Sequence, residues 1–199
     1  MDYSFYAFIS RLKNIGRWSL MRNSSPENVQ EHSHMTAVIA HALAVIRRDV
    51  YGIDCDPGKA AAVALFHDAS EIFTGDMPTP VKYHNPDIRA AYKQVEALAS
   101  EKLLMTLPDA LRGAYAPLLS SAAETGGLAD LIKAADKLAA YIKCLEELKT
   151  GNMEFKSAAA QTLSKLKSLG MPEVDYFMAH FIRAFELTLD ELDFSVGRS

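Results

Sequence analysis

Apolar residues recur along most of this chain every three or four positions, which is the spacing of one face of an α-helix. No convincing run alternates apolar and polar residues as a half-exposed strand would. The pattern predicts helices over residues 3–14, 29–49, 57–71, 87–106, 108–119, 127–149, 154–168 and 173–190. We therefore expect an all-α, single-domain helical bundle over residues 1–199, with a core at about 29–150 and C-terminal helices at about 154–190.

The helix predicted at 57–71 is rich in alanine and apolar on most sides, so it should lie at the centre of the bundle. Asp56 and Pro57 form a suitable N-cap and first helical residue for it. Residues 17–28 and 74–80 predict loops, and the prolines of the second segment argue against a helix there. The last eight residues are expected to fray. The apolar stripes of the other helices include Val38, Ile39, Ala42, Ile46, Val95, Leu98, Leu103, Leu131, Ala135, Leu138 and Ile142.

Composition narrows the class of protein. The chain has 199 residues, of which 49% are hydrophobic and 23% charged, and these values suit one domain with a real core. A net charge of −4 and the lack of a basic cluster argue against a nucleic-acid polymer or a membrane surface as partner. The two cysteines form no CxxC motif, and neither a signal peptide nor a membrane-spanning stretch is evident. The sequence therefore predicts a cytoplasmic protein.

Candidate chemistry begins where an apolar run leads into His67 and Asp68, with Glu71 one helical turn later. On a continuous helix, adjacent side chains point about 100° apart, so both could reach one ion only at the edge of an apolar face. Glu71 would fall on the same side of that helix. By residue type alone, a carboxylate at a helix end is more often exposed than catalytic.

Asp136 lies beside the apolar stripe of the helix predicted at 127–149. An isolated buried carboxylate costs several kcal/mol, so Asp136 needs a cation, a basic side chain or hydrogen-bond donors. Lys133 and Lys137 are the ordinary alternative partners. A single buried histidine such as His32 is likewise more often a core residue than a ligand. Together, however, two imidazoles and two carboxylates suit a catalytic divalent ion, whereas closed structural zinc sites usually recruit cysteine.

The order of His32, His67-Asp68 and Asp136 resembles the H…HD…D motif of the HD phosphohydrolase superfamily. The flanking segments are similar to those of its bacterial 5'-deoxynucleotidases, and the resemblance extends over nearly the whole chain. The matching segments are Arg17-Trp18, 27–33, 67–71 and the Gly75-Asp76-Met77-Pro78-Thr79-Pro80 loop. The resemblance implies an HD-type bundle, usually a homodimer, that hydrolyses deoxyribonucleoside 5'-monophosphates to deoxyribonucleoside and phosphate. It also implies one divalent ion; Co²⁺ or Mn²⁺ is expected, and other first-row ions are possible.

Residue roles follow from the same resemblance. The implied metal ligands are His32, His67, Asp68 and Asp136. The implied catalytic residues are Glu71 and Asp68. The implied substrate-binding residues are Arg17, Trp18, His32, Asp76, Met77, Pro78, Thr79 and Asp136. Arg22 and Lys82 are further candidates for phosphate binding.

These residue types suit the reaction. A bound ion lowers the pKa of the water that attacks phosphorus, and Glu71 can act as acid, base or water-orienting group. Arg17 offers a fork for phosphate oxygens. Trp18 can disfavour a ribose 2'-hydroxyl by burying it without a partner. Without the family, a surface arginine and a core tryptophan explain these two residues equally well.

Two other functions compete with this hypothesis. An HD phosphohydrolase acting on a triphosphate or a guanosine polyphosphate would need more basic side chains near the motifs than this chain offers. A non-catalytic nucleotide-binding sensor would not need Glu71, because binding alone requires no general acid or base.

Overall fold

The computed structural model describes residues 2–82, 84–120 and 128–192. Within these ranges the regular elements are all helical, apart from an isolated antiparallel bridge between Gly16 and Asn28. The all-α prediction is therefore confirmed. The helices are α1 (Phe5–Ile9), η1 (Ser10–Asn14), α2 (Val29–Val45), η2 (Ile46–Val50), α3 (Pro57–Leu65), α4 (Glu71–Thr74), α5 (Thr79–Lys82), α6 (Pro86–Met105), α7 (Asp109–Leu119), α8 (Ala129–Lys149), η4 (Met153–Phe155), α9 (Lys156–Ser168), α10 (Pro172–His180), η5 (Ile182–Glu186) and η6 (Leu189–Glu191).

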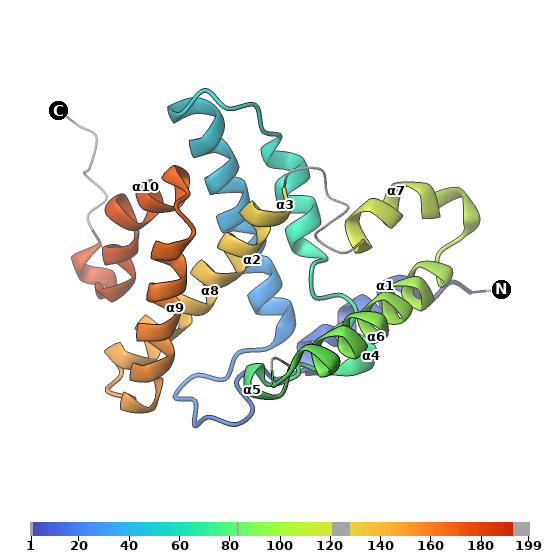
Figure 1. Ribbon diagram of the computed structural model, residues 1–199, viewed down its shortest axis with the longest axis horizontal. Coiled ribbons are helices and arrows are strands. Elements are labelled where there is room, and N and C mark those ends of the chain that lie inside the picture. Colours follow the sequence, from blue (N-terminus) through green and yellow to red (C-terminus); the bar gives the residue numbers. More distant parts are fainter. Residues whose placement is uncertain (1, 83, 121–127, 193–199) are drawn as a thin grey trace.

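The centre of the bundle is formed by α2, α3 and α8, which pack against one another (Figure 1). Small side chains let the three backbones approach closely, and the larger ones fill the space between them. The central position predicted for the alanine-rich α3 is confirmed. The buried residues of this core include Ala40, Leu43, Ala44, Ala60, Ala64, Leu131, Ala134, Ala135 and Leu138.

Two peripheral layers flank this centre. Helices α9 and α10 lie on one side of it, and α1, α4 and α6 lie on the other (Figure 1). Phe177 of α10 is buried in the main core, whereas Phe181 is 45% exposed. Phe5 of α1 and Leu103 of α6 are fully buried in a second apolar cluster with Leu107.

Capping residues explain where several helices begin. Asn28 caps α2: its side chain accepts the Glu31 N–H, and the Glu31 carboxylate accepts the Asn28 N–H. Asp56 caps α3 with Pro57 at the first helical position, as the sequence predicted. These local bonds fix the directions in which α2 and α3 enter the core.

Some predicted helix boundaries are wrong. The segment 173–190 is not one helix, because α10 ends at His180 and the chain continues as the tighter helix η5. The segment 74–80 is not all loop, because α5 begins at Thr79. Pro80 is compatible with this helix because it lies in the first turn, where its missing N–H would have no partner. The predicted fraying of the C-terminus falls on residues 193–199, which lie outside the described residues.

Three apolar residues predicted for the core are exposed instead: Val38 by 51%, Val95 by 47% and Leu98 by 57%. Helix α2 turns Ala37 and Ala40 into the core, so Val38 points elsewhere. Helix α6 is peripheral and buries only a narrow stripe along its length. Among the described residues, no helix is long and apolar enough to cross a membrane.

Candidate metal centre

His67 and Asp68 lie in a turn and not on a helix, contrary to the prediction that one helix runs to Glu71. Helix α3 ends at Leu65, and residues 66–70 form consecutive tight turns before α4. The His67 N–H bonds the Ala64 carbonyl, and the Ala69 N–H bonds the Phe66 carbonyl. The turn brings His67 Nε2 to 3.0 Å from Asp68 Oδ2, whereas on a continuous helix the two side chains would point about 100° apart.

The His67 ring is fixed by the end of α3. Its Nδ1 lies 2.7 Å from the Ala64 carbonyl oxygen, so Nδ1 carries a proton and donates it. Nε2 then lies at ion-pair distance from Asp68 Oδ2, 3.0 Å, but the angle of this contact is not that of a hydrogen bond, and Nε2 has no hydrogen-bond partner among the described residues. A carbonyl that orients the outer nitrogen is a common support for a metal-binding imidazole.

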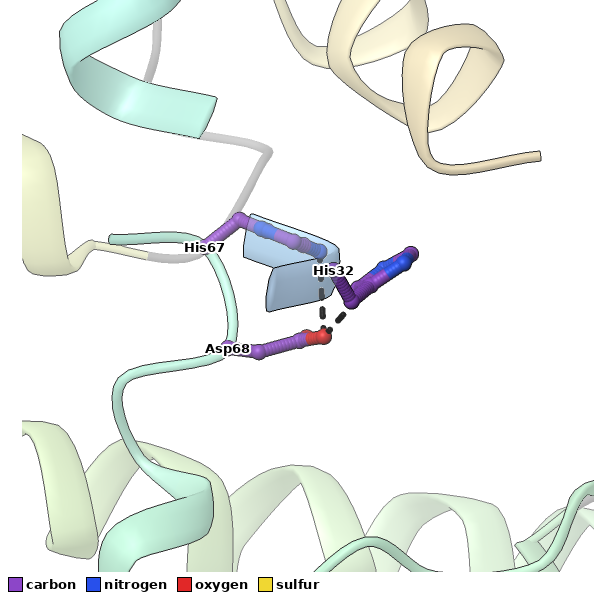
Figure 2. A group of neighbouring side chains, drawn as sticks. All are labelled: His32, His67 and Asp68. Carbon is purple, nitrogen blue, oxygen red and sulfur yellow. Dashed lines mark ion pairs between the residues drawn. The ribbon is translucent and has the colours of Figure 1, made fainter. Parts of the chain in front are cut away.

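His32 and Asp136 reach the same place from two other helices. His32 of α2 is fully buried, and its Nε2 lies 3.8 Å from Asp68 Oδ2 and 3.0 Å from Asp136 Oδ1. One ligand atom each from His32, His67 and Asp68 lies within 4.8 Å of the others (Figure 2). Asp136 of α8 joins this group through His32. Four residues from three distant segments therefore converge where α2, α8 and the turn after α3 meet.

Asp136 is not explained by a lysine pair. Lys133 pairs with Asp130 at 3.4 Å, which leaves it engaged on another part of α8. Lys137 Nζ is 4.0 Å from Asp136 Oδ2, at the limit of an ion pair. The contact of Asp136 Oδ1 with His32 Nε2, at 3.0 Å, is shorter than its contact with Lys137.

The electrostatics of the cluster favour positive charge. Burial lowers the pKa of His67, but Asp68 and Asp136 outweigh it and raise this pKa to about 9. Burial raises the pKa of Asp68, but His67 outweighs it and holds this pKa well below its usual range. Asp136 behaves in the same way beside His32. Two ionised carboxylates thus favour a cation between them, and a divalent ion can take the place of the imidazole proton.

Glu71 is the first residue of α4 and is 5% exposed. The alternative interpretation, an exposed carboxylate at a helix end, is therefore excluded. Its Oε2 is buried with no hydrogen-bond partner among the described residues. Burial, followed by repulsion from Asp68 and Asp76, raises the pKa of Glu71 to about 9. A buried carboxyl with a free oxygen and a raised pKa is the environment expected of a catalytic acid.

The segment after α4 approaches the same cluster. Burial raises the pKa of Asp76, and its charge interacts with Arg17, Asp68 and His32. Met77 and Pro78 are half-buried in the loop before α5, and the Thr79 side chain lies outside the described part of the chain. Lys82 pairs with Glu96 at 2.7 Å and lies over the Tyr92 ring.

Arg17 reaches the cluster from the loop between η1 and α2, and Trp18 follows it in that loop and packs against Phe155. Arg17 Nη1 lies 3.5 Å from Asp68 Oδ2, which connects this loop to the cluster. A residue that sequence reasoning missed holds both: Glu27 Oε2 accepts hydrogen bonds from Arg17 Nε at 3.1 Å and Trp18 Nε1 at 3.0 Å. No periodic pattern relates residue 27 to residues 17 and 18, so only the folded loop reveals the contact.

Other candidates lie apart from the described contacts of the cluster. Arg22 is exposed beside Asn152, whose side chain donates to the Arg22 carbonyl. The four histidines outside the cluster are exposed. These are His34, His41, His84 and His180.

Solved structures with the same arrangement of helices identify the fold. A HD-domain phosphohydrolase from Listeria innocua superposes with a TM-score of 0.78 at 24% identity, over 92% of this chain and 88% of the other. The cyanophage S-2L HD phosphohydrolase, solved with dA and one catalytic Zn²⁺, superposes with a TM-score of 0.63 at 20% identity, over 94% and 100%. The fold is that of the HD-domain phosphohydrolases, as the sequence predicted.

Sequence relatives narrow this class. The family model described as YfbR-like 5'-deoxynucleotidase matches residues 4–185. A 5'-deoxynucleotidase of Erwinia tasmaniensis is 48% identical over 188 residues, covering 94% of this chain and 95% of the relative. The 5'-deoxynucleotidase YfbR of Escherichia coli is 47% identical and covers 94% of each chain. This chain belongs to the YfbR-like 5'-deoxynucleotidase family.

Proposed function

We propose that this protein hydrolyses deoxyribonucleoside 5'-monophosphates to the deoxyribonucleoside and inorganic phosphate. Membership of the family over residues 4–185 supports this activity. Within the chain, the observation that carries it is the convergence of His32, His67 and Asp68, with Asp136 bonded to His32. The HD phosphohydrolase solved with dA and a catalytic Zn²⁺ shares this fold, which is compatible with a deoxynucleoside product.

His32, His67, Asp68 and Asp136 would hold one divalent ion. The bond from His67 Nδ1 to Ala64 and the lowered pKa values of both aspartates support these ligands. When bound, the ion would supply a more acidic water and reduce the charge on the phosphoryl oxygens. We propose Co²⁺ or Mn²⁺, and a mixed nitrogen and oxygen set also accepts other first-row ions.

Arg17 would bind the phosphate. Its Nε is occupied by Glu27, so the N–H groups of the two terminal nitrogens are left for other acceptors. One of these nitrogens already lies near Asp68. A phosphate oxygen at the cluster could therefore accept from the guanidinium in the fork geometry that arginine favours. His32 and Asp136 would border the same phosphate.

Glu71 would donate a proton to the leaving 5'-oxygen. Its pKa of about 9 means that the carboxyl is protonated at neutral pH. Burial is the largest cause of this value, and burial persists with a cation bound, whereas the repulsion from Asp68 is then reduced. A protonated acid next to the cleaved ester would stabilise the alkoxide as it forms.

The sugar would lie against Trp18. A flat apolar wall near C2' penalises a ribose hydroxyl, because the hydroxyl is buried without a hydrogen-bond partner. Asp76 would accept a sugar hydroxyl, and Met77, Pro78 and Thr79 would line the same side. A preference for deoxyribonucleotides follows from this arrangement.

One assay separates this function from its alternatives. Chelator-treated protein is supplied with Mn²⁺, Co²⁺, Zn²⁺ or Mg²⁺, and phosphate release is measured from the five deoxyribonucleoside monophosphates and from ribonucleotides, dATP and a guanosine polyphosphate. We expect release from the deoxyribonucleoside monophosphates, little from AMP and none without metal. Faster hydrolysis of dATP or the polyphosphate would favour another HD phosphohydrolase. Nucleotide binding with no release under any metal would favour a sensor.

Asp68→Ala tests whether Asp68 is a metal ligand. It should lose activity and its bound ion, measured by mass spectrometry of the metal content. Asp130→Ala is the control, because Asp130 is exposed on α8 and pairs only with Lys133 among the contacts described. It should keep both properties. An ion retained in Asp68→Ala would remove Asp68 from the ligand set.

We further propose that the protein forms a homodimer, as the family resemblance implies. Val95, Leu98 and Met105 lie on one side of α6 and are each about half exposed, which would supply an apolar contact surface. Sedimentation equilibrium of the protein and of Leu98→Lys tests this assignment: dissociation of the variant supports it, and a monomeric wild type refutes it.

A further inference from the structure

The segment between η1 and α2 is a loop whose two ends are hydrogen-bonded to each other. The Arg17 N–H donates to the Glu27 carbonyl at 2.9 Å, and the Val29 N–H donates to the Ile15 carbonyl at 2.9 Å. These two bonds form the bridge between Gly16 and Asn28. The residues at the start and end of the loop therefore face each other, and Glu27 lies opposite Arg17 and Trp18.

The Glu27 carboxylate uses this position to hold both residues with one oxygen. Oε2 accepts from Arg17 Nε at 3.1 Å and from Trp18 Nε1 at 3.0 Å. The site is largely shielded from water, with the Arg17 and Glu27 side chains 12% and 15% exposed. A hydrogen bond to a charged acceptor in such surroundings is stronger and more directional than one in water.

The bond to Nε fixes the plane of the Arg17 guanidinium. A guanidinium is rigid, so fixing Nε also fixes the directions of the terminal N–H groups. Arg17 Nη1 then lies 3.5 Å from Asp68 Oδ2, at the edge of the His/Asp cluster. Glu27 thus aims the free side of the fork at the cluster while remaining outside it.

The bond to Nε1 fixes the Trp18 indole from one edge, and Phe155 packs against its ring with centroids 5.3 Å apart. The Trp18 backbone has φ of 58°, the left-handed region, and among the described residues it is the only non-glycine with positive φ. This conformation is strained for a residue with a Cβ and persists only where the surroundings enforce it. Glu27 and Phe155 hold the side chain, and the Met21 N–H donates to the Trp18 carbonyl at 2.9 Å.

We propose that Glu27 is a positioning residue that couples phosphate binding to sugar selection, by holding the Arg17 fork and the Trp18 indole on one carboxylate oxygen. The inference rests on the proposed function, in which these two residues contact the 5'-phosphate and the deoxyribose. It predicts that one change at Glu27 weakens catalysis and reduces selectivity together.

The test uses the full-length, metal-loaded protein and compares Glu27→Ala, Glu27→Gln and Glu27→Asp on dAMP and AMP. Loss of a charged hydrogen bond predicts a roughly 10- to 100-fold lower kcat/KM on dAMP for Glu27→Ala. The ratio of kcat/KM on dAMP to kcat/KM on AMP should also fall several-fold, roughly as expected when an apolar surface that disfavours one hydroxyl is lost. Glutamine can place an amide oxygen at Oε2, so Glu27→Gln should keep most of the ratio. Aspartate keeps the charge but withdraws it by one methylene, so Glu27→Asp should resemble Glu27→Ala and replaces it if that variant does not fold.

Glu31→Ala is the matched control. Glu31 lies close to the hydrogen-bonded ends of the same loop and accepts a backbone N–H in the α2 cap. It has no described contact with Arg17 or Trp18. It should lose stability with an unchanged dAMP-over-AMP ratio.

A second readout does not depend on activity. Trp18 is the only tryptophan, so intrinsic fluorescence reports on its indole alone. Glu27→Ala should alter the emission spectrum and increase quenching by acrylamide, whereas Glu27→Gln and Glu31→Ala should change little. Titration of dAMP and AMP followed by the same signal measures binding in each variant.

The outcomes are distinguishable. Equal loss on dAMP and AMP, or no loss, in folded Glu27→Ala would overturn the inference while leaving the proposed function intact. If the wild type binds dAMP but releases no phosphate, the proposed function fails, and the binding ratio of the variants decides the role of Glu27. A wild type that binds neither nucleotide overturns both.

Discussion

Glu147 offers the sharpest test of how the loop between η1 and α2 is held. This carboxylate, 1% exposed near the end of α8, accepts the backbone N–H groups of Ser24 and Ser25 at 2.8 and 3.1 Å. It also accepts from Asn152 at 2.7 Å and forms an ion pair with Lys143. The tip of the loop that carries Arg17 and Trp18 is thereby bonded to α8.

The stabilisation can be worked out from the pKa. Burial raises the pKa of Glu147, but the bonds from Lys143, Ser24 and Asn152 outweigh it and lower this pKa from 4.5 to about 2. Since one pKa unit corresponds to about 1.4 kcal/mol, the ionised carboxylate stabilises the fold by roughly 3 kcal/mol. The folded pKa is the lower one, so this stabilisation is complete above pH 4.5 and is lost as the pH falls towards 2.

Glu147→Gln mimics the protonated form and should lose about 3 kcal/mol of unfolding free energy at pH 7, measured by urea denaturation. The melting temperature should fall by roughly 6–12 °C. Below pH 4.5 the difference from wild type should narrow by about 1.4 kcal/mol per pH unit. Glu146→Gln, at the exposed neighbouring position, should change stability by less than about 0.5 kcal/mol. The reasoning is wrong if Glu147→Gln matches Glu146→Gln, or if its deficit does not vary with pH.

Three further predictions address the site and the core. Glu71→Gln should lower kcat by roughly 10²- to 10⁴-fold without loss of bound metal, measured by steady-state kinetics beside metal analysis. Unchanged kcat would exclude a role in proton transfer. Trp18→Ala should raise kcat/KM on AMP relative to dAMP roughly tenfold, and equal rates on both nucleotides in the wild type would refute its role as a selective wall. Leu43→Ala, at a fully buried position of α2, should cost about 2–5 kcal/mol in urea denaturation, whereas Val38→Ala, exposed on the same helix, should cost little; similar losses would contradict the packing described.

Helical spacing was sufficient to predict the all-α class, the central place of α3 and the capping of α3 by Asp56, because these depend on residues within a few positions of one another. The spacing could not predict that Val38 and Leu98 are exposed, because burial depends on which neighbouring helix covers a stripe. The spacing also wrongly predicted that α3 continues to Glu71, because the apolar residues there keep the helical period although residues 66–70 form turns.

The sequence by itself determined the types of the site residues and, through the family resemblance, the reaction. Only the tertiary structure decided how they meet: the turn at 66–70 directs His67 and Asp68 to one place, and α2 and α8 bring His32 and Asp136 to 3.0 Å. Glu27 and Glu147 were recognisable only there, because Glu27 holds residues nine and ten positions away and Glu147 holds backbone N–H groups more than a hundred positions away. Residue types, helical spacing and helix caps can be recognised in short segments of sequence, whereas contacts between distant segments depend on how the helices pack.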